Sequence, residues 1–280
     1  MKRILLPTDF SENAYNAIKY AVQLLKNEEC LFYLLNTYTP VLYDTEYILY
    51  APSHLSLNEV YKNNSQVGLA RVQEKITKAF PNPKHTFHHI SSFSLLNEEI
   101  RAQVDEKKID LIIMGTQGAT GADEILFGTQ TVHAIKRAKC PLLAIPSNFE
   151  YVNPDDVLFP TDYDIDYTQL QLTFLKWFIE MHASELHIMN VFFGKPLAPE
   201  QEKSKKVLAT YFKENKHVFY SIENKSVPLA IYDFQTDKPI DLLVMINNKH
   251  SFFENLLFRP VINELGFHVK IPFLVIPPAK

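Results

Sequence analysis

Residues 114–131 read Met-Gly-Thr-Gln-Gly-Ala-Thr-Gly-Ala-Asp-Glu-Ile-Leu-Phe-Gly-Thr-Gln-Thr, and the rest of the chain is organised around this stretch. The chain has seven glycines in 280 residues, and four of them lie here: Gly115, Gly118, Gly121 and Gly128. Residues 109–114, which are apolar except for Asp110, predict a buried strand before the glycines, and residues 129–139 predict a helix after them. Glycine lets the backbone turn sharply or approach another group closely, and the first N–H groups of a helix attract anions. The stretch therefore predicts a loop that binds phosphate.

Short apolar runs alternate with helical patterns through the first half of the chain. We expect strands at 3–7, 30–36, 86–90, 109–114 and 141–146, with helices between them. The helix at 94–108 is expected to bury one side that carries Leu95, Leu96, Ile100 and Val104. Such alternation predicts an α/β fold, a parallel sheet with helices on both faces. Ligands bind these sheets at the carboxyl ends of the strands, so we expect Pro7-Thr8-Asp9 to lie near Met114-Gly115.

The second half of the sequence repeats the strands of the first half in the same order. Residues 157–163 echo 4–10, residues 240–245 echo 109–114, and residues 272–277 echo 141–146. The first pair is offset by 153 positions and the other two by 131, so the second copy is about 22 residues shorter. We expect two tandem domains, at 1–147 and 155–280, joined by a short linker.

The glycine spacing Gly115-x2-Gly118-x9-Gly128-Thr129 differs from the dinucleotide-binding and P-loop patterns. It resembles the ATP-binding signature of the universal stress protein family. A tight loop with helix-capping glycines is the alternative interpretation. The resemblance covers nearly the whole chain, and it is specific in the first half and degenerate in the second. It implies two five-stranded, Rossmann-like domains of the adenine nucleotide α-hydrolase type.

Members of the family commonly pair through their last strand. The resemblance therefore implies that residues 141–146 and 272–277 join the two halves as a pseudo-dimer within one chain. A homodimer of the whole chain is a further expectation.

The resemblance also implies where a nucleotide binds. Asp9 matches an aspartate that contacts adenosine, although it could instead fix the turn or cap the next helix. Thr37 matches a position whose backbone meets adenine. Thr129 and Thr131 could donate hydroxyls to phosphate or bind a metal ion, and Thr129 could equally be a helix N-cap. The expected nucleotide-binding residues are Pro7, Thr8, Asp9, Thr37, Met114, Gly115, Gln117, Gly118, Gly128, Thr129, Gln130 and Thr131.

ATP or another adenine nucleotide, together with Mg²⁺, is the expected cofactor. No Lys or Arg lies between Met114 and Val132, so the loop lacks the cations that speed phosphoryl transfer. We therefore expect no catalytic residues and at most slow hydrolysis. Asp123 and Glu124 could hold Mg²⁺ or lie at a solvated loop tip, and His133 is expected to be structural.

Two further features of the sequence bear on ligands. Three histidines, His85, His88 and His89, are expected to form a surface group rather than a metal site, because no matching Cys or carboxylate spacing accompanies them.

In the second copy, the positions of Gly115, Gly118, Gly128 and Thr129 carry Ile246, Lys249, Arg259 and Pro260. The nucleotide is therefore expected only in the first half.

Composition narrows the class of protein. The net charge of −4 argues against a broad nucleic-acid surface, and no apolar run is long enough to span a membrane. Two cysteines give no disulfide framework, and the first residues lack a signal-peptide core, so a cytoplasmic protein is expected. The leading hypothesis is an ATP-binding stress-response protein that acts by binding and regulation. The alternatives are a slow Mg²⁺-dependent ATPase or phosphotransferase, and a scaffold that binds no nucleotide.

Overall fold

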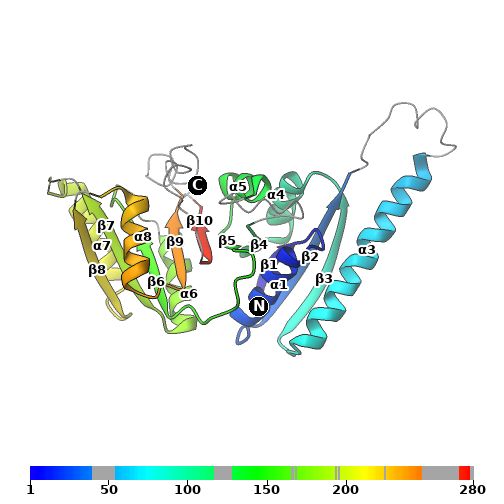
Figure 1. The fold of residues 1–280 in the computed structure, drawn as a ribbon, viewed down its shortest axis with the longest axis horizontal. Helices are drawn as coiled ribbons and strands as arrows, with labels where there is room; N and C mark the ends of the chain where they lie inside the picture. Colours follow the sequence, from blue (N-terminus) through cyan, green and yellow to red (C-terminus); the bar gives the residue numbers. More distant parts are fainter. Residues whose placement is uncertain are drawn as a thin grey trace. The chain divides into compact units, whose positions relative to one another are not determined.

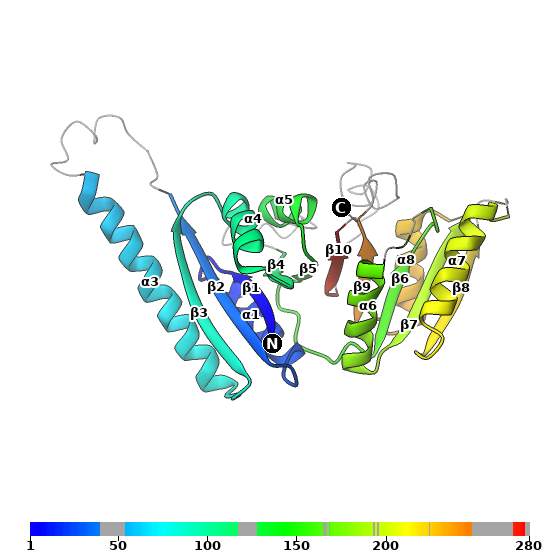
Figure 2. The ribbon, with the colours of Figure 1, turned by 180° about the vertical axis from the view of Figure 1, so that it is seen from behind.

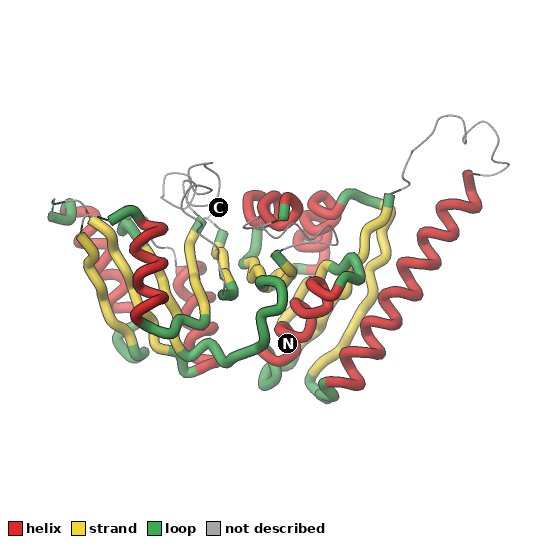
Figure 3. Tube along the Cα trace, in the orientation of Figure 1, coloured by secondary structure: helices red, strands yellow, loops and turns green. Residues whose placement is uncertain are grey.

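The computed structural model describes residues 1–39, 54–116, 128–164, 167, 169–192, 194, 196–223, 225–247 and 271–277. The chain divides into two compact units, Met1–Tyr151 and Val152–Lys280. In each unit, helices pack against a parallel sheet (Figure 1; Figure 3 marks the same elements by type). The predicted α/β fold is therefore confirmed in both halves of the chain.

The first unit has five parallel strands in the order β3-β2-β1-β4-β5. The strands are β1 (Lys2–Pro7), β2 (Cys30–Tyr38), β3 (His85–Phe93), β4 (Leu111–Gly115) and β5 (Leu142–Ile145). The helices are α1 (Glu12–Leu24), α3 (His54–Ala79), α4 (Leu96–Lys107) and α5 (Thr129–Arg137). α1 contacts α3 and α4 contacts α5, and right-handed crossovers place these two pairs on opposite faces of the sheet (Figures 1 and 2).

Burial explains why the central strands are apolar throughout. Ile4, Leu5 and Leu6 of β1 are fully buried because helices cover both faces of the sheet. The edge strand β3 is different: exposed residues interrupt it, and it runs three residues beyond the predicted end at Ile90. Sequence periodicity finds the buried strands more accurately than the edge strand because only the buried ones need continuous apolar residues.

The second unit repeats this topology in the order β8-β7-β6-β9-β10. Its strands are β6 (Asp156–Pro160), β7 (Glu185–Phe192), β8 (His217–Glu223), β9 (Leu242–Ile246) and β10 (Phe273–Ile276). Its helices are α6 (Gln169–His182), α7 (Pro199–Tyr211) and α8 (Val227–Asp237). No helix in the described part of either unit is both long enough and apolar enough to cross a membrane.

The repeat extends to individual hydrogen bonds at the amino ends of the strands. The Asp110 carboxylate accepts the N–H of Arg3 at 2.8 Å, and the Asp241 carboxylate accepts the N–H of Asp156 at 3.0 Å. Each aspartate precedes the fourth strand of its unit and fixes the start of the first strand. The sequence echo Ile-Asp-Leu therefore reflects a shared structural contact.

Candidate functional site

A cavity of about 580 Å³ opens at the carboxyl ends of β1, β2 and β4 in the first unit. The strand order reverses here, because β1 lies between β2 and β4. Every expected site residue that the structure describes lines this cavity: Pro7, Thr8, Asp9, Thr37, Met114, Gly115, Gly128, Thr129, Gln130 and Thr131. Gln117 and Gly118, together with Gly121, Asp123 and Glu124, lie outside the described residues.

The end of β1 is held as a tight turn. The Thr8 hydroxyl accepts the N–H of Phe10, and the Asp9 carboxylate accepts the N–H of Ser11, each at 3.0 Å. Phe10 has a φ of 66°, in the left-handed region that non-glycine residues rarely adopt. Asp9 therefore has the turn-fixing role that the sequence left open, while its carboxylate also borders the cavity.

Asn36 is a cavity residue that sequence reasoning missed. Its side-chain amide donates a 2.7 Å hydrogen bond to the main-chain oxygen of Thr8, which ties the end of β2 to the end of β1. The sequence did carry a signal, since Asn36 is a polar residue at the end of an apolar strand, and Asn190 repeats it in the second half. Ala14, Thr39, Ser94, Leu95 and Leu96 also line the cavity unforeseen.

The strand β4 and the helix α5 meet at one point. The N–H of Gly128 donates to the main-chain oxygen of Thr116 at 2.5 Å. The buried Thr131 hydroxyl donates to the main-chain oxygen of Gly115 at 2.9 Å. Thr131 therefore holds the strand end against the helix start, a role that the sequence did not predict.

Gly128 is the N-cap of α5, so the alternative that Thr129 caps this helix is wrong by one residue. With a φ of −57° and a ψ of 149°, Gly128 has a conformation open to any residue, so backbone strain does not explain the glycine. The N–H groups of Thr129, Gln130 and Thr131 belong to the first helical turn and have no intrahelical acceptor. They lie at the cavity with the positive end of the helix dipole.

The start of α4 forms another side of the cavity and corrects one expectation. Leu95 does not belong to the buried side of this helix. It precedes α4 as the N-cap and is 67% exposed. The leucine side chain cannot cap the helix by a hydrogen bond. Because it is exposed and lines the cavity, it offers apolar surface to a ligand.

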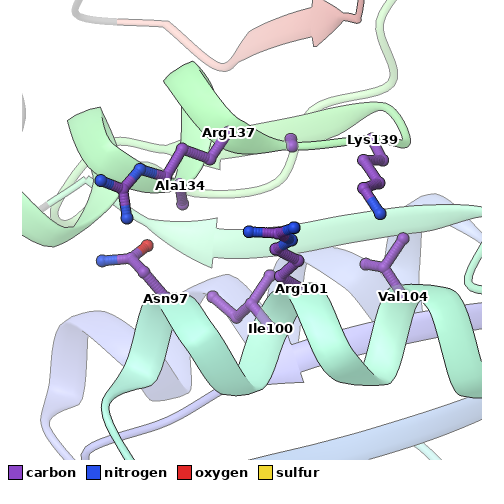
Figure 4. A pocket seen from close by; sticks show the side chains of 8 residues that line it. Asn97, Ile100, Arg101, Val104, Ala134, Arg137 and Lys139 are labelled. Atoms are coloured by element: carbon purple, nitrogen blue, oxygen red, sulfur yellow. The ribbon is translucent and has the colours of Figure 1, made fainter. Parts of the chain in front are cut away.

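Two small contacts fix α4 and α5 against each other. The Asn97 amide donates to the Gln130 side chain at 2.6 Å, and Arg137 pairs with Glu98 at 3.2 Å. Between the helices lies a hollow of about 10 Å³, beside Ile100 and Ala134 (Figure 4). This volume holds about one water molecule, so we interpret the hollow as helix packing and not as a ligand site.

The described lining of the cavity has few ionisable side chains that could take part in acid–base or phosphoryl-transfer chemistry. Among its described lining residues, Asp9 is the one with an ionisable side chain, and no Lys or Arg is present. His133 is exposed on α5 and does not line the cavity. The histidines of β3 divide between its two faces, His85 and His89 on one and His88 on the other, because side chains alternate along a strand.

The second unit keeps the turn and packs a buried tyrosine against it. The Thr161 hydroxyl accepts the N–H of Tyr163, and the Asp162 carboxylate accepts the N–H of Asp164. Tyr167, which lies two residues before α6, is buried and its hydroxyl lies 2.5 Å from that of Thr161. Burial raises the pKa of Tyr167, so its hydroxyl stays neutral.

The counterpart of Gly115 in the second unit is Ile246, which is buried at the end of β9. Lys249, Arg259 and Pro260, which replace the other loop residues, lie outside the described residues.

Comparison with known proteins gives a consistent result. The model of the universal stress protein family matches residues 1–146. Two universal stress proteins of Methanocaldococcus jannaschii are similar to the first half. MJ0531 is 30% identical over 151 residues, which cover 51% of this chain and 81% of that protein. MJ0577 is 31% identical over 152 residues, which cover 51% of this chain and 94% of that protein.

A solved structure resembles the whole chain. It is a universal stress protein from Archaeoglobus fulgidus, with a TM-score of 0.70 and 17% identity over 99% of this chain and 97% of that one. At this identity the likeness shows a shared fold. Together with the family match over the first half, these similarities show that the chain belongs to the universal stress protein family.

Proposed function

We propose that the first unit binds an adenine nucleotide in the cavity at the ends of β1, β2 and β4, with Mg²⁺ on the phosphates. One observation carries the proposal: the residues expected to bind nucleotide, drawn from four separate segments, converge on a single cavity beside the start of α5. Its volume of about 580 Å³ suits a nucleotide-sized ligand.

The phosphates would lie at the start of α5. The first-turn N–H groups and the helix dipole attract anions there, as at other helix N-termini that bind phosphate. Gly128 keeps this approach clear of side-chain atoms. Because no cationic side chain lines the described cavity, main-chain groups and a bound metal ion would carry the phosphate charge.

The nucleoside would occupy the other side of the cavity. Leu95, Leu96 and Ala14 offer apolar surface to a base, and the Asp9 carboxylate offers acceptors to ribose hydroxyls. The main chain at Thr37 supplies polar groups at the end of β2. Such a site would select its ligand by shape and by a few hydrogen bonds.

We also propose that the protein acts in the cytoplasm by binding and regulation in the stress response. The halves would pair through β5 and β10, as the family resemblance implies.

Slow hydrolysis is the second candidate function. The Asp9 carboxylate at the cavity favours it, but the described lining has no cationic group comparable to an arginine finger. Steady-state phosphate release that is lost in Asp9→Asn, with a turnover below the range of about 1–100 per second typical of kinases, would favour slow hydrolysis. A scaffold that binds no nucleotide is the third candidate.

Substitution of Asp9 tests the nucleotide proposal with a matched control. Asp9→Asn keeps an acceptor for the Ser11 N–H but removes the carboxylate charge, so the turn survives. Hydrogen bonds to charged groups contribute about 1.5–3 kcal/mol. The affinity for ATP should therefore fall at least about tenfold.

Asp162→Asn makes the same change in the matching turn of the second unit and should leave the affinity unchanged. Equilibrium dialysis with labelled ATP measures both. Wild-type protein that is folded and retains no ATP would support the scaffold instead.

A further inference from the structure

The amino ends of β6 and β7 in the second unit bring three metal-ligating side chains together. One ligand atom each from Asp156, Glu185 and His187 lies within 4.8 Å of the other two. The sheet causes this grouping: Asp156 is the register partner of Glu185, and His187 follows two residues later on the same face of β7. This cluster lies at the opposite ends of the strands from those at which the nucleotide cavity opens in the first unit.

The His187 ring is held among these ligands by burial. The side chain is fully buried, and its Nε2 lies 2.7 Å from the Asp156 carboxylate. Its Nδ1 has no hydrogen-bond partner within the described residues. Tyr220 and Phe234 pack beside the ring, with centroids 5.7 and 5.9 Å away. Its contact with Asp156 therefore fixes which way the imidazole points.

The surrounding charge favours a cation. The Asp241 carboxylate accepts the main-chain N–H of Asp156 and lies close enough to Asp156 and Asp155 to interact electrostatically with both. Lys238 is a basic residue near the cluster, and its ammonium group donates a hydrogen bond to the Tyr220 hydroxyl at 2.9 Å. No ion pair joins Lys238 to Glu185 or Asp156 in the described part of the unit. The carboxylates of Asp156, Glu185 and Asp241 thus lie close together, and Lys238 interacts electrostatically with two of them, Glu185 and Asp156.

The first unit lacks these three ligands at the matching positions, and two of the nearby acids are replaced there by basic residues. Offsets of 153, 154 and 131 align Asp156 with Arg3, Glu185 with Leu31, and His187 with Tyr33. Asp155 aligns with Lys2, and Lys238 aligns with Lys107. The fold is therefore stable without the three ligands, and their presence in the second unit is not a requirement of this sheet.

We propose that Asp156, Glu185 and His187 bind a divalent first-row metal ion such as Zn²⁺. Two carboxylates and one imidazole suit such an ion, which binds them at about 2.0–2.2 Å. The half-buried carboxylates leave one side open, so water completes the coordination. The ion would link the starts of β6 and β7 and offset the local negative charge.

Calorimetric titration of the full chain with Zn²⁺, without nucleotide, tests the site. We expect one ion per chain and an increase in melting temperature. Glu185→Gln and Asp156→Asn should each lower the affinity at least about tenfold, the lower end of the usual effect of changes near a metal. The half-buried Glu185 is the safer position if His187 variants fail to fold.

Two variants serve as controls. Glu223→Gln makes the same charge change at the far end of β8 and should leave binding unchanged. His88→Gln, in the histidine group of β3, should also leave it unchanged. The proposal is overturned if folded wild-type protein binds no Zn²⁺. Equal binding by wild type, Glu185→Gln and Asp156→Asn, with loss in His88→Gln, would overturn it as well.

Discussion

The Asn36 side chain donates a 2.7 Å hydrogen bond to the main-chain oxygen of Thr8, and Asn190 makes the same bond to Thr161 at 2.8 Å. Both asparagines are buried. Since the contact is present in the unit with the glycine-rich stretch and in the unit without it, it belongs to the fold. In the first unit this hydrogen bond holds the carboxyl ends of β1 and β2 together, and both ends line the cavity.

Replacing either asparagine by leucine should destabilise its own unit. The substitution keeps the volume but leaves a buried main-chain oxygen without its donor, which costs about 1–3 kcal/mol. Chemical denaturation of Asn36→Leu and Asn190→Leu measures the loss. A loss confined to Asn36→Leu would contradict the equivalence of the two contacts. ATP affinity should fall in Asn36→Leu alone.

Thr131 and Thr129 should separate stability from binding. Thr131→Val removes the buried donor to the Gly115 oxygen and should cost about 1–3 kcal/mol of unfolding free energy. Thr131→Ser keeps the hydroxyl and should recover most of this loss. The exposed Thr129→Val should change the unfolding free energy by less than about 0.5 kcal/mol while weakening ATP binding. Thermal melting and ATP titration of the three variants check that Thr131 acts in stability and Thr129 in binding. Destabilisation by Thr129→Val equal to that by Thr131→Val would refute this prediction.

Ala14 should be the residue that keeps the cavity open. Ala14→Tyr places a large ring at the wall of the cavity, and we expect ATP binding to be lost. Ala14→Ser, which is nearly the same size, should bind ATP as wild type does. Circular dichroism would verify that both variants fold. Undiminished binding in a folded Ala14→Tyr protein would place the ligand elsewhere.

The histidines of β3 should make the first unit less stable in acid. Burial lowers the pKa of His85, with Lys84 lowering it further, although the bond to the Leu25 oxygen opposes this. The unfolded chain therefore binds the proton more tightly than the folded chain. Stability is then fully present above about pH 6.5 and falls as the pH drops through the lowered pKa. Denaturation from pH 7 to 5 should show a smaller fall in His85→Gln than in wild type, and an equal fall would contradict the prediction.

Much of the fold could be predicted from the sequence because burial leaves a clear pattern. The strands β1, β4 and β5 are short apolar runs buried on both faces, and periodicity locates each of them. The edge strand β3 and the first residue of α4 were misjudged. Exposed positions at an edge carry no apolar pattern, and Leu95 is apolar although it lies at the cavity and not in the core.

The sequence predicted best those parts of the candidate site that glycines and the ends of strands form. Glycines and strand ends pointed to Gly115, Gly128 and Asp9, which line the cavity. Asn36 and the structural role of Thr131 were missed, because each acts through a contact with a residue far away in the sequence. The acid and histidine cluster of the second unit was missed for the same reason: its members come from two strands and form no sequence motif.

The central claim, one adenine nucleotide in the first unit, is tested most directly by calorimetric titration with ATP and Mg²⁺. Wild type should bind about one nucleotide per chain, because the second unit carries Ile246 where the first has Gly115 and packs the buried Tyr167 against Thr161. Gly128→Val suits the helix start sterically, because φ and ψ there are open to any residue, and it should abolish binding in a folded protein. Two equivalent nucleotides per chain, or unchanged affinity in folded Gly128→Val, would contradict the account.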